Sequence, residues 1–175
     1  MGNEMKNLTD EQLEMAGGVY RMTKNYEEAI RNFESIREKS RSNLMDLAIC
    51  YEQIGDYQKA VEVYQKMDPS CSCNIMLLGR AQKKALDFAS AEATLKMLVG
   101  MSFDPLAFFH LGIVQALLGK SGEASESFEK AMGDVQDSVD RAVYRILVVA
   151  LRQLAENGST VDVMRIQDIL IFGEK

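Results

Sequence analysis

The three cysteines and the single histidine are the residues of this chain best suited to metal binding or nucleophilic catalysis. Cys71 and Cys73 are separated by one residue, and a structural zinc site would need Cys50 and His110 to converge on them. Nothing in the sequence places the four side chains together, so reduced thiols at a junction between helices are the simpler interpretation. The odd number of cysteines favours a reducing compartment, and we expect a cytoplasmic protein.

Other catalytic patterns are equally weak. His110 has no serine or cysteine nearby in the sequence that it could activate. The run from Gly119 to Gly122 resembles part of a phosphate-binding loop but lacks the upstream glycine. Carboxylate catalysis needs two acids placed in one cleft, and the sequence distinguishes no such pair. We therefore expect no enzymatic activity, no metal and no cofactor.

Composition limits the kinds of partner that the chain can have. Its 175 residues are 47% hydrophobic and 26% charged, which is typical of a globular protein that is neither disordered nor fibrous. The net charge of −6 argues against a nucleic-acid partner. No apolar run reaches the roughly 20 residues of a membrane span, so we expect no membrane insertion.

The chain contains an internal repeat defined by three columns of residues. One alanine recurs four times at nearly equal intervals; a small residue lies twelve positions before it, and a large apolar residue lies four after it. The alanines are Ala29, Ala60, Ala91 and Ala124; the small residues are Gly17, Ala48, Gly79 and Gly112; the large residues are Phe33, Tyr64, Leu95 and Phe128.

These columns predict a pair of antiparallel helices in each repeat. A glycine inside a helix costs about 1 kcal/mol relative to alanine, so Gly17, Gly79 and Gly112 need a packing reason. We expect them to let the first helix approach the second closely, with the recurrent alanine receiving the contact. Gly55 and Gly119 lie near the expected turns, where a left-handed cap favours glycine.

The columns resemble the tetratricopeptide repeat, which has a small residue at position 8, alanine at 20 and an aromatic residue at 24. Tyr20 and Tyr51 also match its aromatic position 11, although Gln82 and Gln115 replace that aromatic later in the chain. The resemblance implies an all-α, right-handed α-solenoid of about four helix pairs, followed by a C-terminal capping pair. The first two intervals between the alanines are shorter than the usual repeat of about 34 residues, which implies shortened second helices or tighter turns between repeats.

The expected organisation has three parts. They are an N-terminal tail over residues 1–9, four repeats over 10–135 (about 10–40, 41–71, 72–104 and 105–135), and a capping helix pair over 136–175. The expected helices span 10–23, 26–39, 41–54, 57–67, 73–86, 88–99, 105–118 and 121–133, followed by 136–156 and 160–173.

The resemblance also implies a concave surface that is lined by the first helix of each pair and binds a partner. Several residues aligned with this surface are apolar although the core of the helix pair does not require them, which favours an apolar groove for a peptide or a helix. The candidate partner-binding residues are Met45, Asp46, Ile49, Glu52, Met76, Leu77, Arg80, Lys83, Lys84, Phe109, His110 and Ile113.

The anchors of that groove are expected near Met45, Met76 and Phe109. Three cations that share one face of a helix, at positions 80, 83 and 84, either pair with an acidic residue of the ligand or are neutralised by Glu52 or Asp46. The sequence thus favours a non-enzymatic protein-interaction module. Two alternatives stay open: a self-associating scaffold such as a homodimer, and a small secretion-type chaperone that shields an unfolded client segment.

Overall fold

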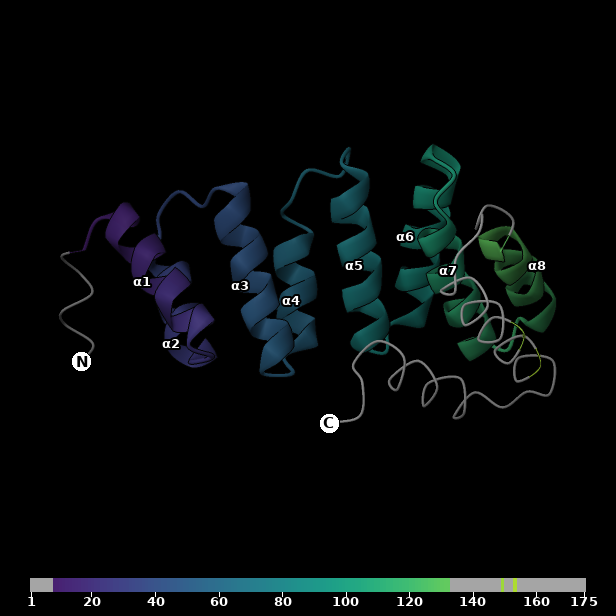
Figure 1. Cartoon of the computed structure of the whole chain (residues 1–175), viewed down its shortest axis with the longest axis horizontal. Helices are drawn as coiled ribbons and strands as arrows, with labels where there is room; N and C mark the ends of the chain where they lie inside the picture. The colour runs from purple at the N-terminus through teal and green to yellow at the C-terminus, as the bar shows by residue number, and fades with distance from the viewer. Residues whose placement is uncertain (1–7, 133–148, 150–152, 154–175) are drawn as a thin grey trace, which may run out of the picture. The chain divides into compact units, whose positions relative to one another are not determined.

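The computed structural model describes residues 8–132 together with Val149 and Gln153; the capping pair expected over 136–175 therefore lies almost wholly outside the described residues. Residues 8–132 form eight α-helices and no β-strand (Figure 1), which confirms the predicted all-α class. The helices are α1 (Asp10–Met22), α2 (Tyr26–Ser35), α3 (Arg41–Gln53), α4 (Tyr57–Tyr64), α5 (Ser72–Lys84), α6 (Phe88–Met101), α7 (Pro105–Leu117) and α8 (Ser121–Met132).

The spacing of the repeats is reflected in helix length. The two shorter intervals between recurrent alanines start at Ala29 on α2 and at Ala60 on α4. Both helices are short, with 10 residues in α2 and 8 in α4. The corresponding helix of the longer third interval, α6, has 14 residues. The shortened second helices that the spacing implied are therefore present.

Local side-chain hydrogen bonds determine where several helices begin. Thr9 and Gln12 form a reciprocal capping box at the start of α1, and Ser40 and Asn43 form another at the start of α3. Asp104 accepts hydrogen bonds from the first backbone amides of α7. These short-range signals explain why the sequence predicts the first residues of the helices so closely.

A left-handed residue connects the two helices of every expected repeat. Gly55 and Gly119 have φ angles of 82° and 74°, as their positions predicted. Lys24 and Leu86 occupy the corresponding turns with φ angles of 60° and 62°. Side chains are strained in this conformation, so the turn geometry is maintained there against local preference.

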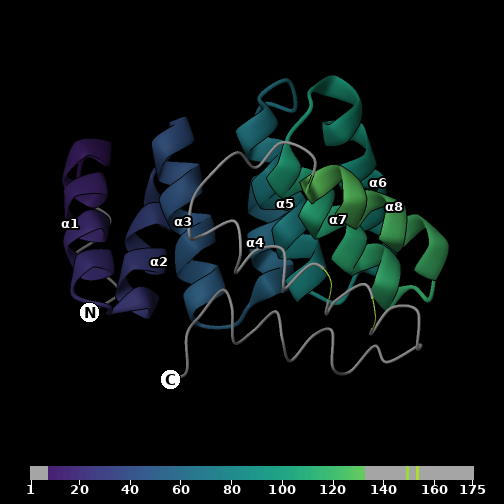
Figure 2. The same cartoon turned by 45° about the vertical axis from the view of Figure 1, so that its right-hand side comes forward.

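The chain divides into two compact units, residues 1–85 and 86–175, and the boundary separates α5 from α6. In the first unit α1 packs on α2 and α3 on α4, and the successive pairs are joined through α2–α3 and α4–α5 contacts. Figure 2 shows these antiparallel pairs following one another along the first unit. In the second unit, α7 packs against both α6 and α8.

The recurrent glycines allow close helix approach, although the contact differs from the one expected. A Cβ atom added at Gly17 would lie 2.9 Å from the Phe33 ring, and one added at Gly112 would lie 2.6 Å from the Phe128 ring. The nearest neighbours are thus the large aromatic residues of the second helix rather than the recurrent alanines. An aromatic ring needs a flat, open surface, and glycine supplies it.

Candidate functional site

The first helices of the pairs in the first unit, α1, α3 and α5, are connected by two ion pairs. Arg21 Nε on α1 lies 3.3 Å from Asp46 Oδ1 on α3. Lys84 Nζ on α5 lies 2.5 Å from Glu52 Oε2 on α3. The side chains of the second pair are only 18% and 14% exposed, so the surrounding protein shields this interaction from solvent.

Glu52 is the centre of a small polar network. Its second carboxylate oxygen accepts a hydrogen bond of 3.0 Å from the Tyr64 hydroxyl. Burial raises the pKa of Tyr64, and the neighbouring carboxylate of Glu52 raises it further. Lys84 also lies over the Tyr57 ring, with Nζ 5.6 Å from the ring centroid. The network holds α3, α4 and α5 in register with one another.

These contacts show which role Lys84, one of the three cations of α5, takes. Glu52 neutralises Lys84, whereas Asp46 pairs with Arg21 of the preceding pair instead. Lys83 is buried, with 5% of its surface exposed. Arg80 is half-buried, and within residues 8–132 no carboxylate forms an ion pair with it.

Exposed apolar side chains lie on α1. Met15 and Met22 are 73% and 79% exposed, and Val19 between them is 55% exposed. The spacing of four and three residues places the three on one side of the helix. Although Met15 and Met22 align with the concave positions of the repeat, the candidate list drawn from the sequence began at α3. Their helical spacing was the signal that could have identified them.

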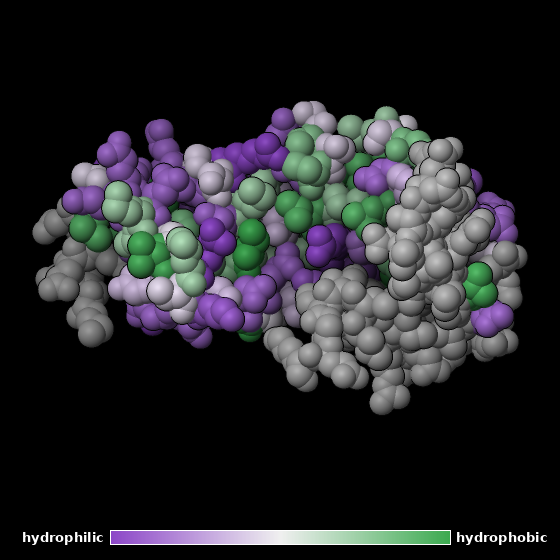
Figure 3. Space-filling model, in the orientation of Figure 1, coloured by the Kyte–Doolittle hydropathy of each residue, from purple (hydrophilic) through white to green (hydrophobic). Residues whose placement is uncertain are grey.

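On α3 and α5 the candidate apolar residues are less exposed. Ile49 and Met76 are half-buried, while Met45 and Leu77 are partly used in packing against the core of the first unit. We call the surface formed by Met15, Met22, Ile49, Met76 and Arg80 the first-helix surface. Figure 3 shows hydrophobic residues over α1, α3 and α5 with hydrophilic residues between them.

The candidates on α7 have a different environment. Phe109, His110 and Ile113 are 6%, 3% and 0% exposed. The physical reason is that α7 is apolar nearly all round, and ten of its 13 residues are buried. The Phe109 ring packs 6.2 Å from the ring of Phe128 on α8. The anchor expected near Phe109 is therefore part of a core in this structure, in the second unit.

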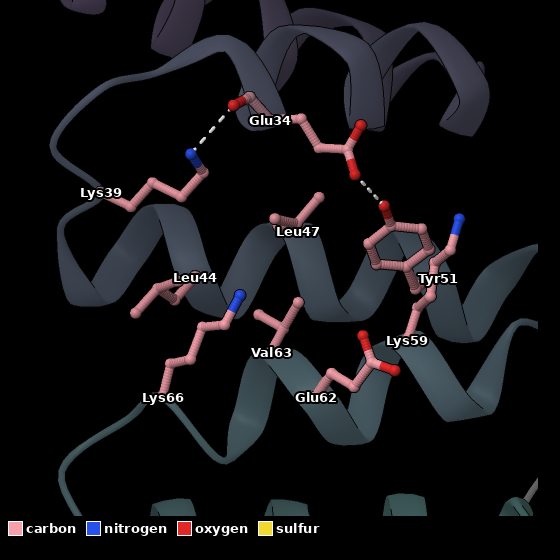
Figure 4. Close-up of a pocket in the computed structure, with 9 residues that line it drawn as sticks. All are labelled: Glu34, Lys39, Leu44, Leu47, Tyr51, Lys59, Glu62, Val63 and Lys66. Atoms are coloured by element: carbon pink, nitrogen blue, oxygen red, sulfur yellow. Dashed lines mark hydrogen bonds between the residues drawn. The ribbon is translucent and has the colours of Figure 1, made fainter.

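A pocket with a volume of about 430 Å³ lies between α2, α3 and α4 (Figure 4). Its apolar lining comes mainly from α3, and its rim carries both lysines and glutamates. The protein's own groups engage several of these charges. Lys39 donates to the backbone carbonyls of Glu34 and Ile36, and the Tyr51 hydroxyl donates to the Glu34 carboxylate. The cavity therefore has little charge selectivity.

The cysteines and the histidine that a zinc site would need have different surroundings. Cys50 is fully buried in the first unit, and burial raises the pKa of its thiol to about 11. His110 lies on α7 in the second unit. Among the described residues, no group of three or more histidine, cysteine, aspartate or glutamate side chains is placed to hold a metal ion.

A family model described as tetratricopeptide repeat matches residues 44–67, which cover most of α3 and all of α4. The match identifies this segment as a tetratricopeptide repeat. In the matched repeat, Ala48, Ala60 and Tyr64 occupy the small, alanine and aromatic columns, and all three are buried.

Solved structures share the fold of this chain. One is the crystal structure of the MamA protein, which is 18% identical in sequence and has a TM-score of 0.66. The alignment covers 100% of this chain and 98% of the MamA chain. Another MamA crystal structure is 20% identical, covers 87% of this chain and 94% of its own, and has a TM-score of 0.64. No curated protein matches the chain. The similarity confirms the predicted α-solenoid class.

The repeat family and the fold together support a protein-interaction or scaffold module. The described part of the chain has no helix that is long and apolar enough to cross a membrane.

Proposed function

We propose that the first-helix surface binds a peptide or a helix of a partner protein and that the chain catalyses no reaction. The observation that carries the proposal is the exposure of Met15 and Met22 on a helix that an ion pair connects to α3. Exposed methionines are flexible and polarizable, so they adapt to apolar ligands of different shapes. Ile49 and Met76 extend the same kind of surface onto α3 and α5.

The charges of this surface restrict the ligand further. Lys84 is neutralised by Glu52 and Lys83 is buried, so the cation offered to a ligand is Arg80. We infer that the bound segment carries apolar residues and one acidic residue that reaches Arg80. The overall charge of −6 favours a protein partner over a nucleic acid. The odd number of cysteines favours the cytoplasm as the compartment of this interaction.

The test compares two double variants of the full chain. Met22→Glu with Met76→Glu changes the first-helix surface, whereas Met97→Glu with Met101→Glu changes two methionines of α6 that are 47% and 51% exposed. A peptide selected against the wild type from a displayed library should bind the first variant at least tenfold more weakly, since one buried methionine contributes about 1.5–3 kcal/mol. The α6 variant should bind normally. Equal affinity of both variants for the peptide would contradict the proposal.

Phe109 is unsuitable for such a test, because a charge at a residue that is 6% exposed is expected to unfold the second unit rather than to block a ligand.

Self-association is the second candidate function, and the continuous apolar side of α1 favours it. The same variants distinguish it: a wild-type dimer in sedimentation equilibrium that becomes monomeric when Met22 is changed would assign the surface to a second copy of the chain. A small chaperone would use this surface too, but for a segment that is unfolded in the free partner.

A further inference from the structure

Two thiols meet at the start of α5. Cys71 is the N-cap residue of the helix and Cys73 is its second residue, and their sulfur atoms are 3.1 Å apart. Both are accessible: Cys71 is half-buried and Cys73 is exposed. A disulfide requires an S–S distance of about 2.05 Å, so a movement of about 1 Å would bring these atoms to bonding distance.

An arginine from the preceding repeat contacts both sulfur atoms. Arg41, the first residue of α3, places Nη2 2.6 Å from Cys73 Sγ and 3.4 Å from Cys71 Sγ. The same nitrogen donates to Asn74 Oδ1 at 3.1 Å. A guanidinium group and a helix N-terminus both stabilise a thiolate, and the thiolate is the reactive form of cysteine.

The two cysteines have unequal acidity. The pKa of Cys71 is lowered, first by the hydrogen bond with the Cys73 thiol and then by the backbone amides of Asn74 and Cys73. The pKa of Cys73 is raised by its hydrogen bond with Cys71. Cys71 is also the N-cap residue of α5, where the helix N-terminus favours a thiolate, so we assign Cys71 as the nucleophile and Cys73 as the resolving thiol.

Cys50 provides an internal reference within the same unit. Its side chain is 0% exposed and burial raises its pKa to about 11. A buried thiol of this kind reacts slowly. Faster reaction at Cys71 and Cys73 would therefore reflect their local environment and not a general property of the cysteines in this chain.

We propose that Cys71 and Cys73 form a reversible dithiol–disulfide site that is oxidised by organic disulfides. In the first step the Cys71 thiolate attacks one sulfur of the disulfide RSSR, which forms a mixed disulfide and releases RS⁻. In the second, Cys73 loses its proton and its sulfur attacks Cys71 Sγ, which forms the intrachain disulfide and releases a second RS⁻. Overall, two protein thiols are oxidised and RSSR is reduced to two RSH.

Oxidation would change the contact between repeats. Arg41 connects the start of α3 to the start of α5 through the two sulfur atoms. A disulfide carries no thiolate charge, so oxidation would weaken the interaction of these sulfur atoms with the guanidinium group of Arg41. The ring closed by two cysteines one residue apart is small and strained, which makes the bond easily reduced. Strained, exposed disulfides are the labile and regulatory ones. The site is independent of whether the first-helix surface binds a peptide.

The test treats the full chain with glutathione disulfide, unfolds it in acid, alkylates the remaining thiols and measures the intact mass. The expected product has lost two hydrogen atoms and carries one alkyl group, on Cys50. Cys73→Ser should instead retain glutathione on Cys71, and Cys71→Ser should react at least tenfold more slowly. Three alkyl groups on the treated wild type, glutathione retained on the wild type, or a covalent dimer would each overturn the proposal.

A second measurement tests the role of the guanidinium group. At neutral pH, Arg41→Gln should slow the alkylation of Cys71 severalfold, whereas Arg31→Gln, on α2, should leave the rate unchanged. Arg31 is a suitable control because it forms its ion pair with Glu28 of its own helix. An unchanged rate in Arg41→Gln would show that this contact does not activate the thiol and would overturn the assignment.

Discussion

Two adjacent glycines in α1 allow a direct test of the close helix approach. A Cβ atom at Gly17 would lie 2.9–3.0 Å from three atoms of the Phe33 ring, and that ring is 1% exposed. A Cβ atom at Gly18 would have nothing within 4 Å. Because both residues are inside the same helix, replacing either with alanine brings the same gain in helix propensity.

The expected free energies of unfolding follow from these distances. Gly18→Ala should stabilise the protein by about 0.5–1 kcal/mol, through the reduced entropy of the unfolded chain. Gly17→Ala should have the same gain but lose about 1–3 kcal/mol to overpacking against Phe33. The two variants should therefore differ by about 1–3 kcal/mol, with Gly17→Ala the less stable.

Urea unfolding followed by far-ultraviolet circular dichroism measures this difference as a shift of the midpoint, provided that the slopes are equal. A double-mutant cycle supplies the control: Phe33→Leu should cost less in the Gly17→Ala background than in the wild type, because the smaller side chain relieves the clash. If both alanine variants raise the midpoint equally, the glycine column has no role in close packing and the reasoning fails.

Two further predictions concern charge and backbone strain. Burial would raise the pKa of Glu92, but hydrogen bonds from Lys120 and Lys96 lower this pKa below its usual value of 4.5. The ionised Glu92 side chain therefore stabilises the protein above pH 4.5, and this stabilisation is lost as the pH falls through the lowered pKa. Glu92→Gln should cost about 1–2 kcal/mol at neutral pH, with the difference from wild type shrinking in acid; a constant difference in urea unfolding across pH would contradict this. Lys24 has a φ angle of 60°, so Lys24→Gly should raise stability by up to about 1 kcal/mol in thermal unfolding, whereas a lower melting temperature would refute the strain at this turn.

Much of the helical architecture is predictable from sequence, because its signals are local. The helix expected over 41–54 is observed as Arg41–Gln53, since the capping box of Ser40 and Asn43 lies within four residues. The C-terminal ends are less predictable. The helix expected to reach residue 39 ends at Ser35, because Ile36 adopts an extended backbone and buries its side chain in the core.

The candidate site was predictable only in part. Alignment with the repeat placed Met76 on the correct helix, but side-chain exposure depends on what packs against each helix. Phe109 therefore belongs to a core although Met76, on the comparable helix of the preceding repeat, is only half-buried. The sequence periodicity describes one helix pair at a time. It does not show how many faces of each helix are covered by neighbouring helices.

The sequence by itself determined the helix pairs, their repeat and the glycine turns, because those features depend on residues within one turn or one repeat period. The tertiary structure decided which charged groups pair and which thiols lie beside a guanidinium group. Asp46 binds the arginine of α1 rather than a cation of α5, and Arg41 reaches Cys73 across 32 residues. Such choices are made by distances between elements, which depend on the packing of whole helices and are not encoded in any single stretch of the chain.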